Sequence, residues 1–596
     1  MIKERLQDLR SAMKERNIDY YVVPTSDFHE SEYVGEYFKA RKWITGFTGS
    51  AGTAVIGLNE AGLWTDGRYF IQAEEQLKGS TVTLFKMGQE GVPTINEYLR
   101  KNLPNGGTIG FDGRVINTRL FEQFEEIAKD KNGKIYSSED LIDPIWKDRP
   151  SLPKSKAWIL EEKFSGASIP EKLKRVRDKM KEEGANVHIA TCLFDIEWIY
   201  NLRGDDIEHV PVNLCFTLIK ENEAYYYINE EDVDGKVRDY LKNNNVTLRP
   251  YETIYDDVKK LSASDKVLLN KAQVNSRITG SLPEGITIID KANPSELMKS
   301  CKNETELKNL VNAHIKDGVA MTKFMYWLKK NVGKIEMTEY SVAEYLRELR
   351  AAQEGFIDIS FGTIAGYGPN AAMMHYSATK EKCATLKPEG MLLVDSGGHY
   401  LEGSTDITRT FALGPVSDIE KKHFTAVLRA NMNLSHARFL YGCSGLNLDI
   451  LARGPMWDMD IDYQCGTGHG VGYLLNIHEG PNGFRWKIVP ERKDSGTLEE
   501  GMCTTDEPGI YLEGKYGIRL ENELICRKGA KNEYGQFMYF EDMTFVPFDL
   551  DLVDKDEMTK TDIERLNEYH KKVYEVISPY LESDEKIWLK EYTKSI

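Results

Sequence analysis

The 596-residue chain has few cysteines, no long apolar run and no excess of basic residues. Its eight cysteines are scattered without a CxxC pair, which is typical of reduced, mostly structural thiols. No stretch approaches the roughly 20 apolar residues of a membrane-spanning helix. The start, MIKERLQDLRSAMKERNIDYYVV, shows no apolar core of the kind that a signal peptide needs. We therefore expect a cytoplasmic protein.

Acidic residues outnumber basic ones. The chain has 94 Asp and Glu against 77 Lys and Arg, a formal net charge of −17. Nucleic acids and anionic membrane surfaces are bound through basic patches. We therefore expect no nucleic-acid partner and no membrane partner, and the balance favours small or neutral ligands.

The length of the chain suggests about three or four domains. Its first half contains an internal sequence repeat. Residues 6–23 (LQDLRSAMKERNIDYYVV) match residues 172–190 (KLKRVRDKMKEEGANVHIA) as a helix, a break and a strand. The later parts of the two copies read WITGFTGS from Trp43 and WIYNLRGD from Trp198. This repeat predicts two related α/β domains, of which the first has an insertion, SDFHESEYVGEYFKARK.

Three breaks divide the chain. Prolines and charges interrupt regular structure in DPIWKDRPSLPKSK, and a long helix with one apolar face starts after ANPSELMKSCKNETELK. After Pro547, Thr561 and Glu564 have capping-box spacing at the start of a helix. The apolar stripe of that helix should pack on the preceding domain, because it is too short for a coiled coil; it comprises Leu566, Tyr569, Val573 and Ile577. We predict domains at 1–153, 154–303 and 304–547, and a helical extension at 548–596.

Four acids and one histidine stand out in the last third. They are Asp395 in VDSGG, Asp406 in STDITRT, His469 in GTGHGVG, Glu507 in TDEPG and Glu521 in RLENEL. Gly514 lies midway between the two glutamates and suits a turn, so these should face each other across a hairpin. MLLVD and DITRTFAL have strand character, with SGGHYLEGS as the turn between them. Asp395 and Asp406 would then form a second cross-strand pair.

This set of side chains predicts a site for two divalent metal ions. Opposed side chains on paired strands have Cβ atoms about 4.5–5.5 Å apart, close to the roughly 3.5–4 Å between the metals of dinuclear hydrolases. Four buried carboxylates would repel one another and take up protons unless cations were present. Hard oxygens with one imidazole favour Mn²⁺ or a similar ion, with Zn²⁺ or Co²⁺ also possible.

The order Asp, Asp, His, Glu, Glu, together with the sequence around each residue, resembles the metal-ligand pattern of the pita-bread metallopeptidases. This family includes methionine aminopeptidase, prolidase and aminopeptidase P. HYSAT around His375 and GTGHGVGYLLNIHEGP with His478 look most like the long, three-domain, cytosolic type of Xaa-Pro aminopeptidase. The likeness extends upstream to GFTGSAGTAVI, LWTDGRYF and WIYNLRGDDIEHVP, and so covers nearly the whole chain. It implies two creatinase/prolidase-type N-terminal α/β domains before a pita-bread catalytic domain.

The resemblance also implies roles for the five residues. Asp406 and Glu521 would bridge both metals, Asp395 would complete one, and His469 and Glu507 would complete the other. A metal-bridging hydroxide would attack the peptide carbonyl. Glu507 would move a proton from that water toward the leaving nitrogen.

Three more residues are assigned by resemblance. His375 and His478 would hydrogen-bond the substrate carbonyl and the tetrahedral oxyanion. Arg68, in TDGRY, would lie at the substrate-binding face, although a fixed salt bridge that supports the turn is an equal alternative. We expect the other histidines considered to be structural: His188, His209, His314, His399, His423, His436 and His570.

The implied activity is release of the N-terminal residue from peptides whose second residue is proline. Such a bond lacks an N–H and has a fixed ring, so it needs a dedicated peptidase. Prolidase, which takes dipeptides, is an alternative, and the duplicated N-terminal domains favour the aminopeptidase. A non-catalytic peptide-binding protein on the same fold should have lost metal ligands, whereas this chain keeps all five.

Long enzymes of this family are typically homodimers. Trp457 lies in RGPMWDMDIDY beside Asp458 and Asp460, which indicates that the segment reaches solvent. Tryptophan is a frequent interface anchor. We therefore expect Trp457 at a dimer interface, with packing in its own core as the alternative.

Overall fold

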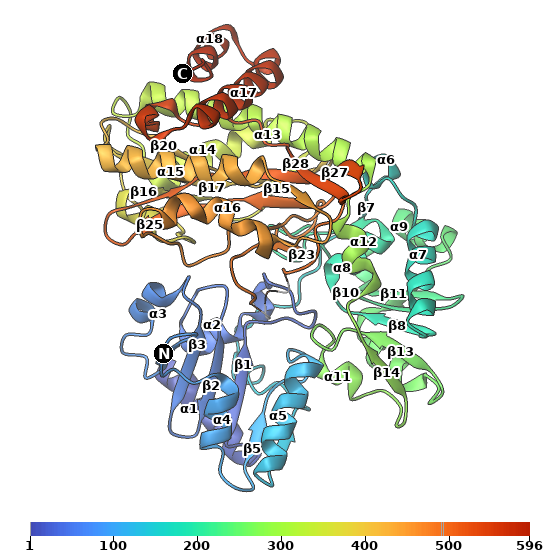
Figure 1. Ribbon diagram of the computed structural model, residues 1–596. Helices are drawn as coiled ribbons and strands as arrows, with labels where there is room; N and C mark the ends of the chain where they lie inside the picture. The colour runs from blue at the N-terminus through green and yellow to red at the C-terminus, as the bar shows by residue number, and fades with distance from the viewer. Residues whose placement is uncertain (1, 490–491, 493) are drawn as a thin grey trace. The chain divides into compact units, whose positions relative to one another are not determined.

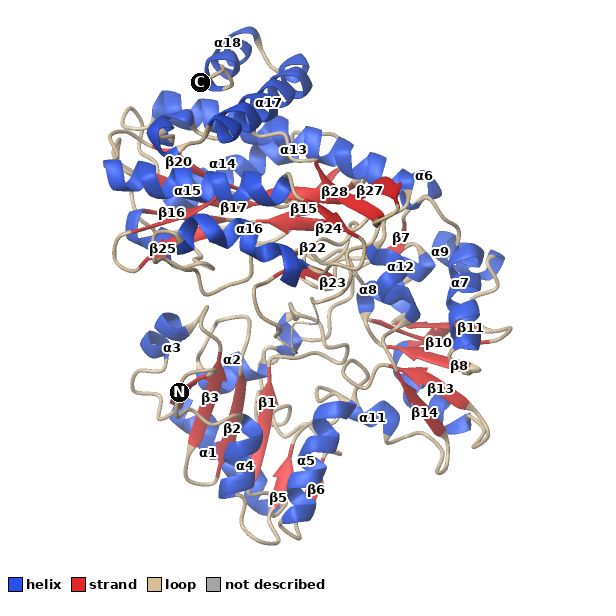
Figure 2. Ribbon diagram, viewed as in Figure 1, coloured by secondary structure: helices blue, strands red, loops and turns tan. Residues whose placement is uncertain are grey.

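The computed structural model describes residues 2–489, 492 and 494–596, which form two compact units. The first unit comprises Met1–Leu160 and Ala167–Ser295, and the second comprises Glu161–Gly166 and Glu296–Ile596. Figure 1 follows the chain from blue at the N-terminus to red at the C-terminus, and Figure 2 separates helices from strands.

The first unit contains two six-stranded sheets with the same topology. One has the order β4-β3-β2-β1-β5-β6 and the other β12-β11-β10-β8-β13-β14. The strands of the first sheet are β1 (Tyr20–Pro24), β2 (Thr53–Gly57), β3 (Ala61–Thr65), β4 (Thr83–Lys86), β5 (Thr108–Gly110) and β6 (Lys134–Tyr136). Those of the second are β8 (Val187–Ala190), β10 (Cys215–Lys220), β11 (Ala224–Ile228), β12 (Thr247–Pro250), β13 (Lys266–Leu269) and β14 (Thr287–Asp290).

The predicted repeat is confirmed by the strand pairing. β1 runs antiparallel to β2 and parallel to β5, and β8 runs antiparallel to β10 and parallel to β13. Each copy begins with a helix, α1 (Ile2–Glu15) or α7 (Ile169–Glu182), and each has a short helix after its first strand, α2 (Ala40–Thr45) or α8 (Leu193–Tyr200).

The insertion in the first copy contacts the second copy. His29 lies in this insertion, with Nε2 2.6 Å from the Tyr251 hydroxyl and Nδ1 2.8 Å from the Thr191 carbonyl. Asn275 Nδ2 donates to the Phe28 carbonyl at 2.9 Å. The insertion therefore helps to join the two halves of this unit.

In the second unit, helices flank short sheets (Figure 2). The helices are α13 (Glu304–Asn331), α14 (Glu339–Ala351), α15 (Asp418–Ser435), α16 (Gly445–Trp457), α17 (Lys560–Ile577) and α18 (Ser583–Tyr592). The two three-stranded sheets are built from β15 (Phe356–Ile359), β18 (Gly398–Tyr400) and β19 (Gly403–Ser404), and from β16 (Ile364–Tyr367), β17 (Met391–Ser396) and β20 (Ile407–Ala412).

A third sheet of this unit has the order β21-β28-β27-β24-β22-β23. Its strands are β21 (Arg438–Leu440), β28 (Gly535–Asp542), β27 (Asn522–Asn532), β24 (Cys503–Asp506), β22 (Gly468–Gly470) and β23 (Glu479–Phe484). A separate hairpin consists of β25 (Gly509–Leu512) and β26 (Tyr516–Arg519). These sheets and their flanking helices agree with the fold that the resemblance to the pita-bread metallopeptidases implies.

Helix α17 packs on the preceding part of the second unit, as predicted. Its stripe residues share one apolar cluster with Phe424 of α15; they are Leu566, Tyr569, Val573 and Ile577. The predicted cap is wrong by two residues, because the Thr559 hydroxyl accepts from the backbone N–H of Asp562 and α17 begins at Lys560. Thr559 and Asp562 have the same capping spacing, which a sequence pattern alone does not distinguish.

The segment after β17 is not the simple turn that we predicted. Residues 398–404 form β18 and β19, and β18 also pairs with β15. Asp395 therefore lies opposite Thr408, and Asp406 precedes that position by two residues. Because side chains alternate along a strand, Asp406 is diagonal to Asp395 on the same face and not directly opposed to it.

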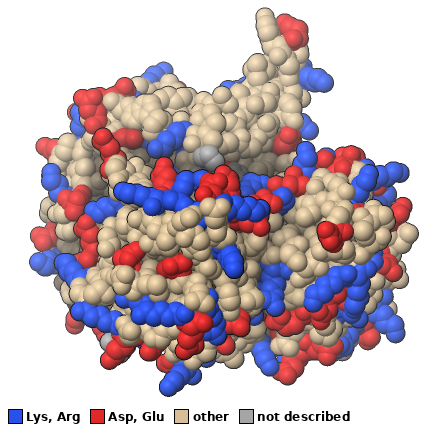
Figure 3. Space-filling model, turned by 90° about the horizontal axis from the view of Figure 1, so that it is seen from below, with Lys and Arg blue, Asp and Glu red and all other residues tan. Residues whose placement is uncertain are grey.

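Surface charges of both signs are mixed. Figure 3 shows Lys and Arg side chains interspersed with Asp and Glu over one face of the molecule. Among the helices of the described residues, none has both the length and the apolar character needed to cross a membrane.

Candidate metal centre

The five predicted ligands lie on or beside strands of the second unit. Asp395 is in β17, Asp406 precedes β20, His469 is in β22, Glu507 follows β24 and Glu521 precedes β27. Ligand atoms of Asp406, His469 and Glu521 all lie within 4.8 Å of one another. His469 Nε2 is 3.6 Å from Asp406 Oδ2 and also 3.6 Å from Glu507 Oε1. The fold thus gathers four of the five directly.

Asp395 lies diagonal to Asp406 on the paired strands, and Arg519 links it further to this group. Arg519 Nη2 donates to Asp395 Oδ2 at 2.5 Å, and Arg519 Nε donates to the Thr408 hydroxyl at 3.2 Å. That hydroxyl donates to Glu521 Oε2 at 2.7 Å. Arg519 therefore fixes Asp395 and, through Thr408, the carboxylate of Glu521.

The predicted hairpin between the two glutamates is confirmed. β25 pairs antiparallel with β26, with Gly509 opposite Arg519, and Gly514 in the turn has a φ of +71°. Continuing this register by two residues puts Glu507 opposite Glu521. A positive φ is strained for side chains with a Cβ, so glycine suits this turn.

The electrostatics of the group favour cations, although two details differ from the prediction. Glu507 is only half-buried, and Arg519 offsets part of the negative charge. Asp406 and Glu521 are nonetheless 4% and 2% exposed. Burial, followed by repulsion from neighbouring carboxylates, raises the pKa of each well above its usual value.

The side chains fit a pair of divalent ions. Buried oxygens on two of the carboxylates, Asp395 Oδ1 and Asp406 Oδ1, have no hydrogen-bond partner among the described residues. Unpaired buried carboxylate oxygens are costly, and a bound cation would satisfy them. Carboxylate oxygens with one imidazole form a donor set for a hard or borderline divalent ion.

Metal binding should therefore release protons. The raised pKa values mean that metal-free folded protein holds protons on Asp406 and Glu521 at pH values where an unfolded chain has lost them. The stability of the metal-free protein should then fall as pH rises through this window. Metal ligands must be deprotonated, so we expect loading with metal to release protons within this window. Titration calorimetry in buffers of different protonation enthalpy measures this release, and buffer-independent heats would contradict it.

The two histidines assigned by resemblance lie differently. The ring of His478 packs edge-to-face on His469, with centroids 4.3 Å apart at 88°. His375 is exposed and follows Met374, whose carbonyl accepts from Arg519 Nη2 at 3.5 Å. His478 therefore contacts a proposed ligand, and the segment before His375 contacts Arg519.

Arg68 belongs to the first unit and has a partner there. Its Nε and Nη2 donate to the two carboxylate oxygens of Asp66 at 2.8 and 2.7 Å. The Arg68 backbone N–H also donates to Asp66 Oδ1, at 3.1 Å. This geometry suits the salt bridge that supports the turn.

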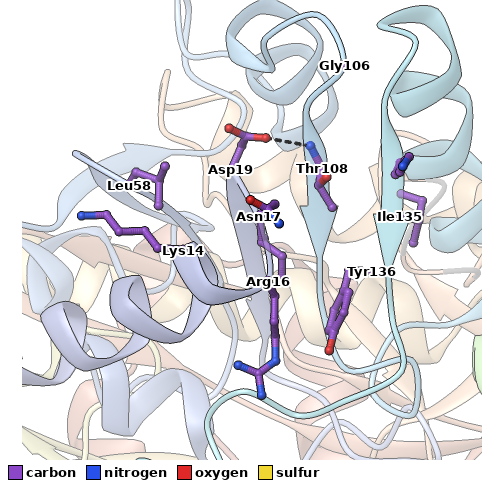
Figure 4. Close-up of a pocket in the computed structure, with 11 residues that line it drawn as sticks. Lys14, Arg16, Asn17, Asp19, Leu58, Gly106, Thr108, Ile135 and Tyr136 are labelled. Atoms are coloured by element: carbon purple, nitrogen blue, oxygen red, sulfur yellow. Dashed lines mark hydrogen bonds between the residues drawn. The ribbon is translucent and has the colours of Figure 1, made fainter.

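A pocket of about 640 Å³ in the first unit contains none of the predicted site residues (Figure 4). It lies where α1 leads into β1, and Asp19 accepts there from the backbone N–H of Thr108 at 2.8 Å. Lys14, Arg16 and Tyr136 also line it.

Sequence reasoning missed several residues around this centre. Arg519 and Glu523 lie two residues before and after Glu521. Because alternate residues of an extended chain share a face, this spacing could have indicated that both side chains lie near the site. Tyr511, whose hydroxyl accepts from Arg519 Nη1 at 2.8 Å, and His314 had no sequence signal that linked them to the site.

Comparison with known families agrees with this fold and site. Metallopeptidase family M24 matches residues 308–528, and the C-terminal region of this peptidase family matches residues 536–596. The Creatinase/Prolidase N-terminal domain matches twice, over 5–145 and 148–306. The class is therefore that of the M24 metallopeptidases with duplicated N-terminal domains.

Full-length relatives narrow the class. Aminopeptidase P2 of Arabidopsis thaliana is 36% identical over 100% of this chain and 89% of its own length. A probable Xaa-Pro aminopeptidase P of Coprinopsis cinerea is 37% identical over 100% and 98%. The crystal structure of X-prolyl aminopeptidase from Caenorhabditis elegans, described as a cytosolic enzyme with a di-nuclear active site, has a TM-score of 0.94 and 32% identity over the whole of both chains. The chain belongs to the Xaa-Pro aminopeptidase P family.

It is accordingly a dinuclear metallo-aminopeptidase that hydrolyses the Xaa-Pro bond at the N-terminus of peptides. The Xaa-Pro dipeptidase of Bacillus anthracis, at 23% identity and a TM-score of 0.52, shares the fold over 64% of this chain.

Proposed function

We propose that Asp406 and Glu521 bridge the two metal ions, that Asp395 completes the ligands of one, and that His469 and Glu507 complete those of the other. The observation that supports this assignment most directly is the convergence of Asp406, His469 and Glu521 within 4.8 Å. Mn²⁺ is the ion that we propose, because the donors are mostly carboxylate oxygens, and Zn²⁺ or Co²⁺ could replace it. When bound, two such ions supply a nucleophile from water near neutral pH.

In this proposal Glu507 carries a proton from the attacking water to the leaving nitrogen. Its side chain is 22% exposed, and Thr505 Oγ1 is a weak partner at 3.3 Å. A half-buried carboxylate with a long hydrogen bond can reorient, as a proton carrier must.

The substrate contacts in the proposal come from three side chains. His478 and His375 donate hydrogen bonds to the substrate carbonyl and to the oxyanion that develops from it. Arg68 is proposed as a further substrate contact, and the alternative is that it only supports the turn through its salt bridge with Asp66.

A comparison of substrates separates this activity from prolidase. We expect release of the first residue from the tripeptide Arg-Pro-Pro as well as from Arg-Pro, and dependence of both reactions on added Mn²⁺. Cleavage of the dipeptide alone would support prolidase. Binding of the tripeptide without hydrolysis at saturating Mn²⁺ would support the non-catalytic alternative.

We also propose that the domains comprise residues 1–153, 154–303 and 304–547, followed by a helical extension at 548–596. We further propose a cytoplasmic location. The location is supported by the description of the Caenorhabditis elegans enzyme as cytosolic.

The protein is proposed to be a homodimer. Trp457, at the end of α16, is 40% exposed and packs edge-to-face on Trp486, which is 45% exposed. Ile488 is 62% exposed on the same segment as Trp486. Exposed aromatic and aliphatic groups of this kind are typical anchors of protein interfaces.

Trp457→Glu should convert the dimer to a monomer with little change in metal content, since burying that charge in an apolar contact is costly. Sedimentation measures the change. Tyr534→Glu, at a 74% exposed position in the turn before β28, is the matched control and should leave the dimer intact. A wild-type monomer, or a folded Trp457→Glu dimer, would rule out this anchor.

A further inference from the structure

A buried carboxylate outside the five proposed ligands contacts the backbone of one of them. Asp406 directly precedes β20, and its N–H donates to Glu523 Oε1 at 2.7 Å. Glu523 lies in β27, two residues after Glu521, and its side chain is fully buried. Glu523 thereby connects the backbone of Asp406, one proposed bridging ligand, to β27, the strand that follows Glu521, the other proposed bridging ligand.

A histidine from a distant helix faces this carboxylate. His314 Nε2, on α13, lies 3.1 Å from Glu523 Oε1, and both side chains are fully buried. His314 Nδ1 lies 2.9 Å from the Leu310 carbonyl. A carbonyl can only accept, so Nδ1 carries a proton and the ring is held with Nε2 toward Glu523.

The same face of α13 reaches the residue before Asp406. Asp317 follows His314 by three residues, so the two share a helix face. Its Oδ2 accepts from the Thr405 hydroxyl, and its Oδ1 accepts from Arg350 Nε, each at 2.5 Å. The Thr405–Asp406 backbone is therefore held from α13 by direct contact and through Glu523.

A buried carboxylate at this place has an electrostatic cost. Glu523 adds a negative charge beside the buried Asp406, and burying an acid is costly unless it is paired. A positioning function gives a reason for this arrangement. The backbone N–H of Asp406 gains a strong acceptor, and a protonated His314, whose Nε2 lies 3.1 Å from Glu523 Oε1, would supply the opposite charge. Glu523 Oε2 has no hydrogen-bond partner among the described residues.

We propose that His314 and Glu523 are positioning residues that hold the Asp406 backbone in the orientation required for metal binding. The proposal rests on the assignment of Asp406 as a metal ligand. In metal sites, residues that orient a ligand typically contribute about 10- to 100-fold in metal affinity.

The first test compares two substitutions of Glu523. Glu523→Leu removes both the acceptor and the partner of His314, whereas Glu523→Gln keeps an oxygen that can accept from Asp406. We expect the apparent Kd for Mn²⁺, measured by calorimetry and by metal content after dialysis, to rise about 10- to 100-fold in the leucine variant. The glutamine variant should show a smaller rise. Saturating Mn²⁺ should restore most of kcat. Unchanged Mn²⁺ affinity in folded Glu523→Leu would overturn the proposal.

A double variant separates positioning from general stability. His314→Leu with Glu523→Leu removes the buried charge altogether, and such replacements are often neutral or stabilising. We expect its melting temperature to recover relative to Glu523→Leu while the Mn²⁺ affinity stays low. Recovery of both together would show that the pair is only structural, and would overturn the proposal.

Lys329→Met is the matched control. Lys329 is on the same helix and pairs with the buried Asp549 and with Asp551. It should lose stability without losing Mn²⁺ affinity, and an equal loss of affinity would overturn the claim of a specific effect. Failure of the ligand assignment is distinguishable, because Asp406→Ala would then keep both ions whatever the Glu523 variants do.

Discussion

Replacing Asp406 or Glu521 by alanine is expected to abolish hydrolysis and to remove more than one metal ion per chain. Each carboxylate is proposed to contact both ions, so its loss deprives both of a ligand. The two side chains are almost completely buried, and a water molecule that took the place of either would carry no compensating charge. Metal analysis after dialysis, with turnover of an Xaa-Pro tripeptide, measures both effects.

Asp395→Ala is the matched control for the bridging assignment. Asp395 is proposed to serve one ion, and it is also paired with Arg519. We expect this variant to lose about one ion and to keep the other. If Asp406→Ala and Glu521→Ala also lost only one ion each, the bridging assignment would be wrong.

The metal-free forms of the same variants provide an independent readout. Burial, and after it repulsion between neighbouring carboxylates, raises the pKa values of Asp406 and Glu521. Removing either carboxylate should relieve repulsion in the metal-free protein. The variants should therefore lose less stability than wild type when the pH of the metal-free protein is raised.

Replacing His375 or His478 by alanine is expected to lower kcat/KM by about 10²-fold or more while both metal ions remain bound. This is the usual cost of removing a hydrogen-bond donor that stabilises the transition state. His478 also packs on His469, so His478→Phe is a sharper variant: it keeps an aromatic ring and removes the donors. Steady-state kinetics with parallel metal analysis tests both positions.

His436→Ala is the control for an exposed histidine. His436 is exposed at the end of α15, and its Nδ1 lies 3.0 Å from the Met432 carbonyl. Its loss should leave kcat/KM within about twofold of wild type, as is usual for surface substitutions. Normal turnover in His375→Ala or His478→Phe would return that histidine to a structural role.

Local features of the sequence were enough for much of the fold. The repeated pattern of helix, break and strand predicted the two related sheets of the first unit, because each copy is specified by its own periodicity. Gly514 marked the hairpin between Glu507 and Glu521, because a turn with positive φ favours glycine. The apolar stripe of α17 predicted its docking, since one face had to be buried.

The candidate ligands were also readable in the sequence, and their residue types indicated metal before any geometry was known. Their mutual arrangement was not readable. Asp406 is diagonal to Asp395 because β17 and β20 pair with Asp395 opposite Thr408, and the segment between them forms β18, which pairs with β15, and β19, which pairs with β18. Strand pairing between separate segments depends on which surfaces they bury together, and local periodicity does not encode that choice.

The sequence by itself determined the helices, the strands, the repeated architecture and the residue types of the metal centre. Only the tertiary structure decided which charged groups meet there. Arg519 reaches Asp395, and His314 reaches Glu523, across long separations in the chain. Neither pair has a sequence signature, because side chains from different elements are brought together by the packing of helices on sheets and not by any local pattern.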